Sequence, residues 1–514
     1  MRRFFRIFFS RYALSALIIL LDLALVAYLV FYFSVYSLVF FILAALVNIL
    51  VFLQIVNRDI NPEVKLTWLA VVMAVPLFGC AIYLIFNSRS LHRKESRLML
   101  DIVTRLGSTV SDTASGTNHA LLQLANESAH LAGYAHAILR DDPLAELYCG
   151  GVSDYYTSGE DFYESLKRAL SSAERYIFIE TFILAEGKMW NGIYDILKKK
   201  VSDGVEVRIL YDDIGSMSTV DAHFDQSLCR EGIACRRFGK VTPRLVATHN
   251  NRDHRKIAVI DGTVAFTGGV NISDEYINEK KRFGYWKDGG IRITGDAAAG
   301  FTKLFLSLWC YTERKSDFCA DYLPKRKTND GCGYMIPFGS GPSPVYPQPV
   351  CKNLIMGMIN CAQSFVYIST PYLIIDYDLT EALRMAGARG VDVRIITPGV
   401  PDKRFINVMT KSSYPRLIEA GVRIFEYSPG FLHEKSIVTD GEVAAVGTVN
   451  LDYRSLIHHY ECGVWIAKHP VIPEILDGFM KTLESSVEIT AEQAKLTVPQ
   501  RIAKNLARIF APLM

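Results

Sequence analysis

An internal repeat constrains the fold of this chain more than any other feature. The blocks FYESLKRALSSAERYIFIETF, DGVEVRILYDDIG, GIACRRF and HRKIAVIDGTVAFTGGVNISDEY recur in the same order as AQSFVYISTPYLI, RGVDVRIITPG, GVRIFEY and HEKSIVTDGEVAAVGTVNLDYRS. Each set alternates strand-like apolar runs with helix-like segments, which is typical of an α/β domain. The repeat is too long for a solenoid. The sequence therefore predicts an α/β fold of two duplicated lobes, with the Pro- and Gly-rich stretch 331–349 between them.

Each lobe carries the pattern His-x-Lys-x-x-x-x-Asp. The His, Lys and Asp of the two copies are His254, Lys256 and Asp261, and His433, Lys435 and Asp440. Residues two apart on a strand face the same side, so each histidine is expected to project with its lysine into one site. We place both aspartates in the same candidate catalytic set, although a structural role in a backbone turn is favoured for them.

These residue types predict a phosphodiester site. A lysine supplies positive charge for phosphate oxygens, and an asparagine downstream in each lobe, Asn271 and Asn450, supplies a neutral donor. One histidine can attack phosphorus, while a second protonates the leaving alcohol and later activates the incoming one. One histidine cannot do both in the same step, which explains two copies of the motif in one chain.

Two acidic residues join the candidate substrate-binding set. Asp288 in YWKDGGIRI and Glu461 in HHYECGVWI each precede or begin an apolar strand. A carboxylate behind a histidine fixes its tautomer and stabilises its cation, and the alternative is a surface charge at a strand end. A lysine beside each histidine opposes a divalent cation, so no metal and no cofactor is expected.

The N-terminal region, residues 1–90, predicts membrane helices. An apolar run from Ala13 to Val56 has Asp22 as its one formal charge, and a second run covers Leu66 to Phe86. A spanning helix needs about 20 apolar residues, so two or three spans are expected. A signal peptide would be much shorter. Basic residues flank both ends of the region and leave its orientation open.

The remaining boundaries follow from composition. Residues 91–150 are interpreted as a polar juxtamembrane connector, 151–330 as the first lobe, 331–486 as the second lobe, and 487–514 as a basic amphipathic tail suited to a membrane surface. The net charge of +3 argues against nucleic acid as a partner. None of the ten cysteines forms a CxxC pair, so a thiolate zinc site is not expected.

The paired motifs resemble the two HKD motifs of the phospholipase D superfamily. YDDIGS at 211–216, TPYLI at 370–374 and the segment WLAVVMAVPLFGCAIYL are similar to bacterial cardiolipin synthases. The resemblance implies two phospholipase D-like α/β lobes around one pseudo-twofold active site, preceded by transmembrane helices. It also implies His254 as nucleophile and His433 as general acid/base, with the lysines and asparagines holding the phosphate. The residues alone are compatible with either histidine as the nucleophile and the other as the general acid/base.

The implied reaction moves a phosphatidyl group between two phosphatidylglycerol molecules through a phosphohistidine, giving cardiolipin and glycerol without metal or nucleotide. A phospholipase D-type hydrolase, or transfer to another alcohol, uses the same site and stays open. The expected partners are phospholipids and the membrane, the expected location is the cell membrane as a multi-pass protein, and a homo-oligomer is compatible with the sequence. His458, His459 and Tyr460 depart from the Asn-Phe more common before this glutamate in such enzymes.

Overall fold

The structure is a computed structural model that describes residues 20–21, 24–25, 27–29, 31–32, 38–58, 60–86, 93–108, 111–241, 251–318, 320–323 and 332–495. The chain divides into two compact units, which are described separately. The N-terminal unit comprises Met1–Ser90, Lys240–Asn250 and Asn505–Met514, and the two-lobed unit comprises Leu91–Gly239 and Asn251–Lys504.

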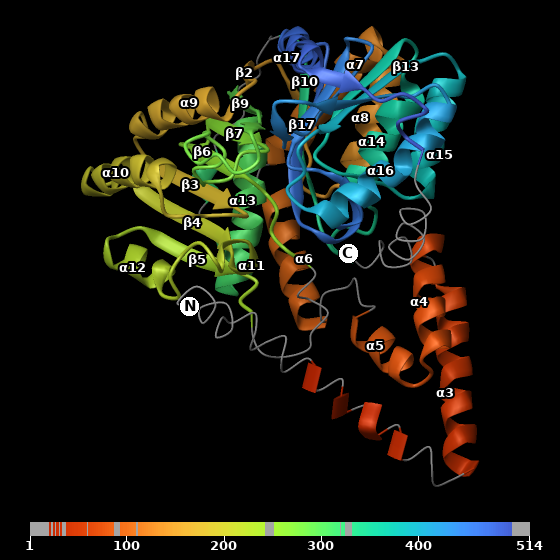
Figure 1. The fold of residues 1–514 in the computed structure, drawn as a ribbon. Coiled ribbons are helices and arrows are strands. Elements are labelled where there is room, and N and C mark those ends of the chain that lie inside the picture. The colour runs from red at the N-terminus through yellow and green to blue at the C-terminus, as the bar shows by residue number, and fades with distance from the viewer. Residues whose placement is uncertain are drawn as a thin grey trace. The chain divides into compact units, whose positions relative to one another are not determined.

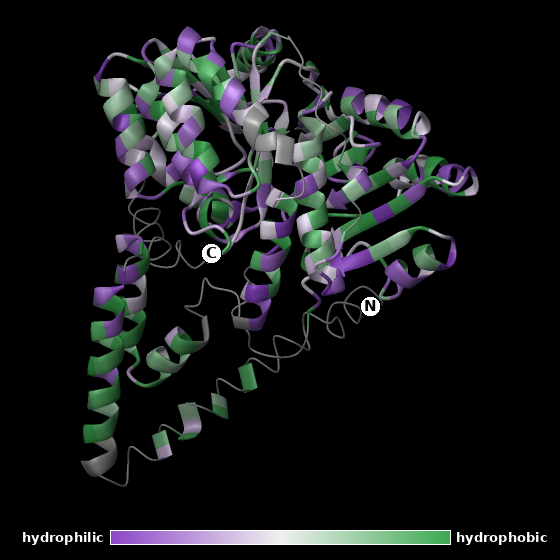
Figure 2. Cartoon of the chain, turned by 180° about the vertical axis from the view of Figure 1, so that it is seen from behind, coloured by the Kyte–Doolittle hydropathy of each residue, from purple (hydrophilic) through white to green (hydrophobic). Residues whose placement is uncertain are grey.

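Helices make up the described part of the N-terminal unit: α3 (Leu38–Asn57), α4 (Pro62–Ala74) and α5 (Phe78–Phe86). Helix α3 is hydrophobic along most of its length (Figure 2). Asn61 caps α4 by accepting a hydrogen bond from the Glu63 amide at 2.9 Å, and Pro62 fits the first helical turn. The three helices share a small core of Val51, Ile55, Val64, Trp68, Val72, Cys80 and Tyr83.

The expected run Leu66–Phe86 is divided between α4 and α5, because a proline at position 76 cannot continue the hydrogen-bond ladder of a helix. Among the described residues, no helix combines the length and the apolar character that crossing a membrane requires. Most of the run from Ala13 to the start of α3, including Asp22, lies outside the described residues, and so does the expected amphipathic helix of the tail.

The first lobe is built on a sheet that has seven strands in the described part of the chain. In order across the sheet these are β2 (Val152–Tyr156), β9 (Gly290–Thr294), β7 (Val264–Gly268), β6 (Ile257–Ile260), β3 (Tyr176–Thr181), β4 (Glu206–Asp212) and β5 (Ala234–Phe238). Strands β3, β4 and β5 are parallel, and the other neighbours are antiparallel. The lobe's helices are α9 (Gly159–Ser171), α10 (Lys188–Ser202), α11 (Asp213–Ser216), α12 (Phe224–Arg230) and α13 (Ala298–Glu313) (Figure 1).

The second lobe repeats this order and adds a strand at each edge, giving nine within the described residues. Across the sheet they are β1 (Tyr148–Cys149), β10 (Tyr334–Ser340), β19 (Glu461–Ala467), β17 (Val443–Gly447), β16 (Ser436–Thr439), β11 (Phe365–Ser369), β13 (Asp392–Pro398), β14 (Arg423–Tyr427) and β20 (Ser486–Glu488). Its helices are α14 (Val350–Cys361), α15 (Tyr377–Ala388), α16 (Arg404–Glu419) and α17 (Ile472–Glu484). The matching strand order confirms the predicted duplication.

Short elements complete the two-lobed unit. Strand β8 (Tyr285–Lys287) of the first lobe pairs in parallel with β15 (Gly430–Leu432) of the second, so the two lobes share backbone hydrogen bonds. Strand β12 (Leu373–Ile374) pairs with β18 (Leu451–Asp452). Two short helical turns lie at Ala320–Tyr322, before β10, and at Arg454–His458, after β18. The second of these turns is a π-helix.

Residues 91–150, interpreted from the sequence as a polar juxtamembrane connector with a helical stretch around 99–106, pack as helices within the two-lobed unit. They form α6 (Arg93–Ser108), α7 (Ser111–Glu127), α8 (Ala129–Asp141) and the edge strand β1 of the second lobe. In α6 the apolar residues Met99, Ile102, Val103 and Leu106 follow helical spacing and are buried against the core that includes α13. Helices α7 and α8 enter the core of the second lobe. The polar residues are the outer faces of packed amphipathic helices.

Helix α13 lies between the two sheets. It contacts β3, β5 and β6 of the first lobe and β10 of the second (Figure 1). Phe301, Leu304, Phe305 and Leu308 are buried in a core that also contains residues of β17 and β19. Because α13 packs against both sheets through this core, it fixes the two lobes to each other. An active site assembled from residues of both lobes therefore has a defined geometry.

Candidate active site

The structure brings the two motif histidines to the boundary between the lobes. Nδ1 of His254 lies 2.9 Å and 3.1 Å from the carboxylate oxygens of Glu461, which belongs to the other lobe. Nδ1 of His433 lies 2.7 Å from Oδ2 of Asp288, again from the other lobe. Each imidazole therefore takes its carboxylate from the opposite half of the duplication, and neither half-site is complete in one lobe.

Backbone contacts dock the segment before each motif on the opposite lobe. The His254 amide donates to the Tyr460 carbonyl at 2.9 Å, and the His433 amide donates to the Lys287 carbonyl at 2.7 Å. The first contact adjoins an isolated bridge between Asp253 and Tyr460, and the second follows the β8–β15 pairing. His254 and His433 therefore sit in extended chain just ahead of β6 and β16, not within those strands.

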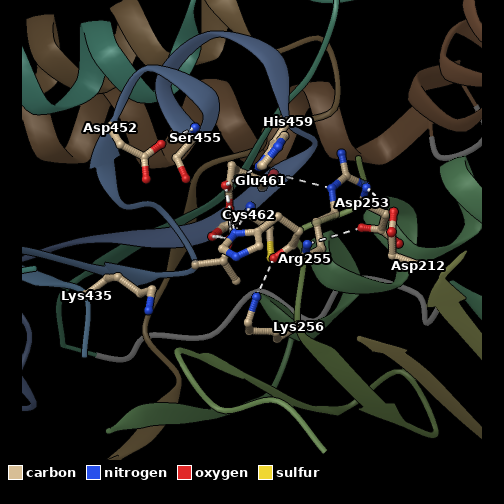
Figure 3. A network of polar contacts seen from close by, with 12 residues as sticks. Asp212, Asp253, Arg255, Lys256, Lys435, Asp452, Ser455, His459, Glu461 and Cys462 are labelled. Atoms are coloured by element: carbon tan, nitrogen blue, oxygen red, sulfur yellow. Dashed lines mark hydrogen bonds and ion pairs between the residues drawn. The ribbon is translucent and has the colours of Figure 1, made fainter. Parts of the chain in front are cut away.

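The two lysines follow the histidines into the same buried site. Nζ of Lys256 donates to the His254 carbonyl at 2.7 Å, and Nζ of Lys435 donates to the His433 carbonyl. Both side chains are buried, and burial lowers the pKa of Lys435 to about 7 and also lowers that of Lys256. Figure 3 shows the two lysines on the same side of Glu461. A phosphodiester anion placed there would restore their charge.

Burial and the neighbouring lysines keep both imidazoles neutral in this state. Burial, reinforced by the Lys256 charge, lowers the pKa of His254 well below its usual value. Burial and then the Lys435 charge lower the pKa of His433 to about 4. His433 and Lys435 also contribute to the lowered pKa of His254, which places the groups of both lobes within electrostatic reach of each other.

The two carboxylates differ although their positions correspond. Burial opposes ionisation of Asp288, but the His433 and Lys435 charges outweigh it and lower its pKa. At Glu461 the effect of burial exceeds that of the neighbouring charge and hydrogen bonds, and it raises the pKa to about 8. Glu461 also accepts a hydrogen bond from the Thr448 hydroxyl. The Asp288 carboxylate is thus anionic beside His433, whereas the Glu461 carboxyl lies near its titration point beside His254.

The motif aspartates lie at the far ends of β6 and β16, away from the imidazoles. Asp261 accepts hydrogen bonds from the amides of Glu174, Arg175 and Tyr176 at 2.8 to 2.9 Å. Asp440 makes the same three contacts with the amides of residues 363–365 at 2.7 to 2.9 Å. Both residues have positive φ, 53° and 54°. Their placement in the catalytic set is therefore corrected to the structural role that the sequence favoured.

The two motif asparagines occupy different surroundings. Oδ1 of Asn271 accepts from the Ile183 amide at 3.0 Å, and its Nδ2 donates to the Tyr276 hydroxyl at 2.6 Å. Asn271 thus fixes the turn after β3 in the first lobe. In the part of the chain that the structure describes, Oδ1 of the buried Asn450 has no hydrogen-bond partner. The expected phosphate-holding role stays a prediction for both.

Several residues that shape the site were not singled out from the sequence. Arg252 forms a buried ion pair with Asp212 at 2.9 Å, and Asp212 also accepts from the Asp253 amide at 3.0 Å. These contacts hold the segment that leads to His254. The one sequence signal for this ion pair was the YDDIGS block, which contains Asp212. That block served only as evidence of the family resemblance. Thr448, directly after a motif glycine, had no counterpart in the first lobe to draw attention to it.

One group of possible metal-binding atoms lies in the site. Among the described residues, His254, His459 and Glu461 place nitrogen and oxygen atoms within 4.8 Å of one another. The hydrogen bond between His254 and Glu461 accounts for this closeness, and the buried Lys256 charge opposes a cation. We assign no metal to the site, and the expectation of metal-independent chemistry stays a prediction.

The duplicated α/β lobes and the paired His-Lys site are those of the phospholipase D superfamily. The family model "Cardiolipin synthase, PLD-like domain" matches residues 166–309 and 355–483. A second model, "Phospholipase D-nuclease N-terminal", matches residues 46–86. The chain therefore belongs to the cardiolipin synthase family.

Relatives agree over nearly the whole chain. An uncharacterised protein of Streptococcus mutans is 37% identical over 90% of this chain and 99% of its own length. A cardiolipin synthase of Alkalihalophilus pseudofirmus is 33% identical over 93% of each chain. The crystal structure of the phosphatidylserine synthase of Haemophilus influenzae superposes with a TM-score of 0.56 at 14% identity, covering 74% of this chain and 97% of that one. At that identity the superposition supports the fold alone.

Proposed function

We propose that this protein is a cardiolipin synthase that condenses two phosphatidylglycerol molecules into cardiolipin and glycerol through a phosphohistidine. The single observation that carries the proposal is the crossed pairing of two imidazoles with carboxylates of opposite lobes, beside two buried lysines. The names of the relatives support the choice of reaction within the superfamily.

The proposed reaction has two displacements at one phosphorus. Nε2 of His254 attacks the donor phosphodiester, a P–N bond forms, and the bond to the glycerol headgroup breaks as His433 transfers a proton to the leaving oxygen. The hydroxyl of a second phosphatidylglycerol then gives its proton to His433 and attacks phosphorus, which breaks the P–N bond and releases His254. Lys256 and Lys435 stabilise the phosphoryl oxygens throughout.

The proposed place of action is the cell membrane, with the chain as a multi-pass protein. The apolar sequence from Ala13 to Val56 and the phospholipid substrates support this proposal. The match of residues 46–86 to an N-terminal family model supports a role for this region in the family. Single engineered cysteines along residues 1–90, labelled with a membrane-impermeant reagent in intact and in opened right-side-out vesicles, test it. Some positions labelled in intact vesicles and others only after opening would support crossing segments, whereas access to every position from one side alone would contradict them.

Expression in a bacterial host that lacks cardiolipin tests the activity. Mass spectrometry of its lipids should show cardiolipin with the intact chain and none with His254→Ala or His433→Ala. Brief reaction with phosphatidylglycerol labelled in its phosphate should leave acid-labile label on the protein, which His254→Ala removes. Label that persists in His254→Ala and disappears in His433→Ala would exchange the two roles.

The runner-up is hydrolysis, in which water replaces the second lipid and phosphatidic acid is the product. The same residues serve both reactions, so the product decides. Purified protein in phosphatidylglycerol vesicles should release glycerol and form cardiolipin in equal amounts. Phosphatidic acid as the sole phospholipid product would establish the hydrolase, and a new diester formed with an added alcohol would establish a different acceptor.

A further inference from the structure

The backbone contacts make His459 the counterpart of Trp286. The tripeptides Trp286–Asp288 and His459–Glu461 each end in the carboxylate that holds a motif histidine, and the middle residue of each accepts that same histidine's amide through its carbonyl. The ring centroid of Trp286 lies 5.4 Å from that of His433, and the ring centroid of His459 lies 5.6 Å from that of His254. The first residue of each tripeptide therefore flanks one imidazole.

The tryptophan contributes a hydrogen bond in its half-site. Its indole Nε1–H donates to Oδ2 of Asp288 at 3.4 Å, the oxygen that also contacts His433. His459 offers an N–H of the same kind at the same place, because its Nδ1 lies 3.8 Å from Oε1 of Glu461. That separation is just too long for a hydrogen bond.

His459 is buried without the partners that such a side chain normally has. It is 8% exposed, and within the described residues neither ring nitrogen has a hydrogen-bond partner. Figure 3 shows it on the side of Glu461 opposite to the two lysines, so it lies behind the carboxylate and not among the phosphate-binding groups. A buried polar group without a partner costs about 1–3 kcal/mol, which favours a contact that forms at another stage of the reaction.

We propose that His459 is a positioning residue that donates its Nδ1–H to Glu461 when the phosphodiester is bound, and so keeps the Glu461 carboxylate ionised against the Nδ1–H of His254. The proton at Nδ1 leaves the lone pair on Nε2 of His254, the nitrogen that attacks phosphorus. The proposal assigns the same task to a histidine in one half-site and to a tryptophan in the other.

The charges around the pair favour this arrangement. Burial raises the pKa of Glu461 to about 8, so each added donor shifts the group toward the ionised form. Burial lowers the pKa of His459 well below its usual value, so the ring is neutral and carries one N–H. The charged and titratable groups that face the pair are Arg252, His254, Lys256, Cys351, Lys435, Asp452, Arg454 and His458.

The test is the pH profile of kcat for cardiolipin formation by the full-length protein in phosphatidylglycerol vesicles, because kcat reports the ionisation of groups in the substrate-bound enzyme. His459→Leu removes the donor, His459→Gln keeps a neutral N–H, and His458→Asn is the matched control one residue away. A hydrogen bond to a charged group is worth about one pH unit or somewhat more. We expect the acidic limb of His459→Leu to move up by about one unit, with about a tenfold loss at neutral pH that recovers at high pH. His459→Gln and His458→Asn should follow the wild type.

Several outcomes would overturn the proposal. A loss of activity in His459→Leu that is equal at every pH would give His459 a packing role, and no loss of activity would give it none. An acidic limb of the His459→Gln profile that coincides with that of His459→Leu would exclude a role for His459 as hydrogen-bond donor. His459→Met provides the same comparison if the leucine variant does not fold. The inference rests on the proposed activity: a wild type that makes no cardiolipin refutes that activity, whereas an unshifted limb in an active variant refutes only the role of His459.

Discussion

Replacing Asp440 by alanine should destabilise the two-lobed unit while leaving the chemistry of the folded enzyme intact, and Asp261→Ala should do the same. Each carboxylate accepts three backbone amides that begin the neighbouring strand, β11 or β3. Alanine removes all three acceptors at once. The amides are at least partly accessible, so water replaces some of the lost bonds and the effect stays moderate.

The magnitude follows from the three bonds. At about 1 kcal/mol net for each, the loss is about 3 kcal/mol in the free energy of unfolding. Both residues also adopt positive φ, where aspartate is better tolerated than alanine. For a cooperative unit of roughly 400 residues, about 3 kcal/mol lowers Tm by about 3–4 °C.

Thermal unfolding and specific activity of the purified variants, measured in the same detergent, check this expectation. Asp→Asn at each position is the matched control, because its side chain keeps one acceptor oxygen and should recover part of the lost stability. Specific activity per folded molecule should stay within about twofold of wild type, since neither carboxylate approaches an imidazole. A fall of more than tenfold in either alanine variant with Tm unchanged would refute the structural role and return the aspartates to the reaction.

Three further predictions concern the site. Because burial lowers the pKa of Lys435 to about 7, the side chain loses its charge as pH rises through that value. The KM for phosphatidylglycerol should therefore increase above pH 7, and a KM that does not change with pH would contradict this. Arg252→Ala strands the buried Asp212 carboxylate and should cost about 3–5 kcal/mol, seen as a lower Tm, whereas an unchanged Tm would show that the pair is dispensable. Removal of divalent metal by a chelator should leave cardiolipin formation unchanged, and loss restored by added metal would establish a metal site.

The sequence predicted those parts of the fold and site that depend on local pattern. Repeated blocks predicted two similar lobes because the same segments form the same strands in the same order. The His-x-Lys spacing placed His254 with Lys256, and His433 with Lys435, because extended chain turns alternate residues to one side. The intervening Arg255 and Glu434 point elsewhere, toward α13 and Tyr155 respectively.

What the sequence did not predict depends on how the lobes pack. The pairing of His254 with Glu461, and of His433 with Asp288, joins residues of opposite lobes, and no spacing along the chain encodes it. In residues 91–150 the sequence indicated a helical stretch around 99–106, within α6, but not α7 and α8. Polar residues dominate the composition of α7 and α8, and their apolar side chains are covered only where they enter the core of the second lobe.

The two half-sites share their backbone, so any difference in role must come from side chains that differ. Transfer requires one imidazole that is neutral with a free lone pair and one that carries a proton for the leaving group. An aspartate whose pKa is lowered stabilises a cation on His433, whereas a glutamate whose pKa is raised to about 8 does so less well for His254. Bound phosphodiester adds negative charge near both rings, and the ring beside the anionic aspartate takes up the proton first. The asymmetry of the carboxylates therefore supports His433 as the proton donor and His254 as the nucleophile.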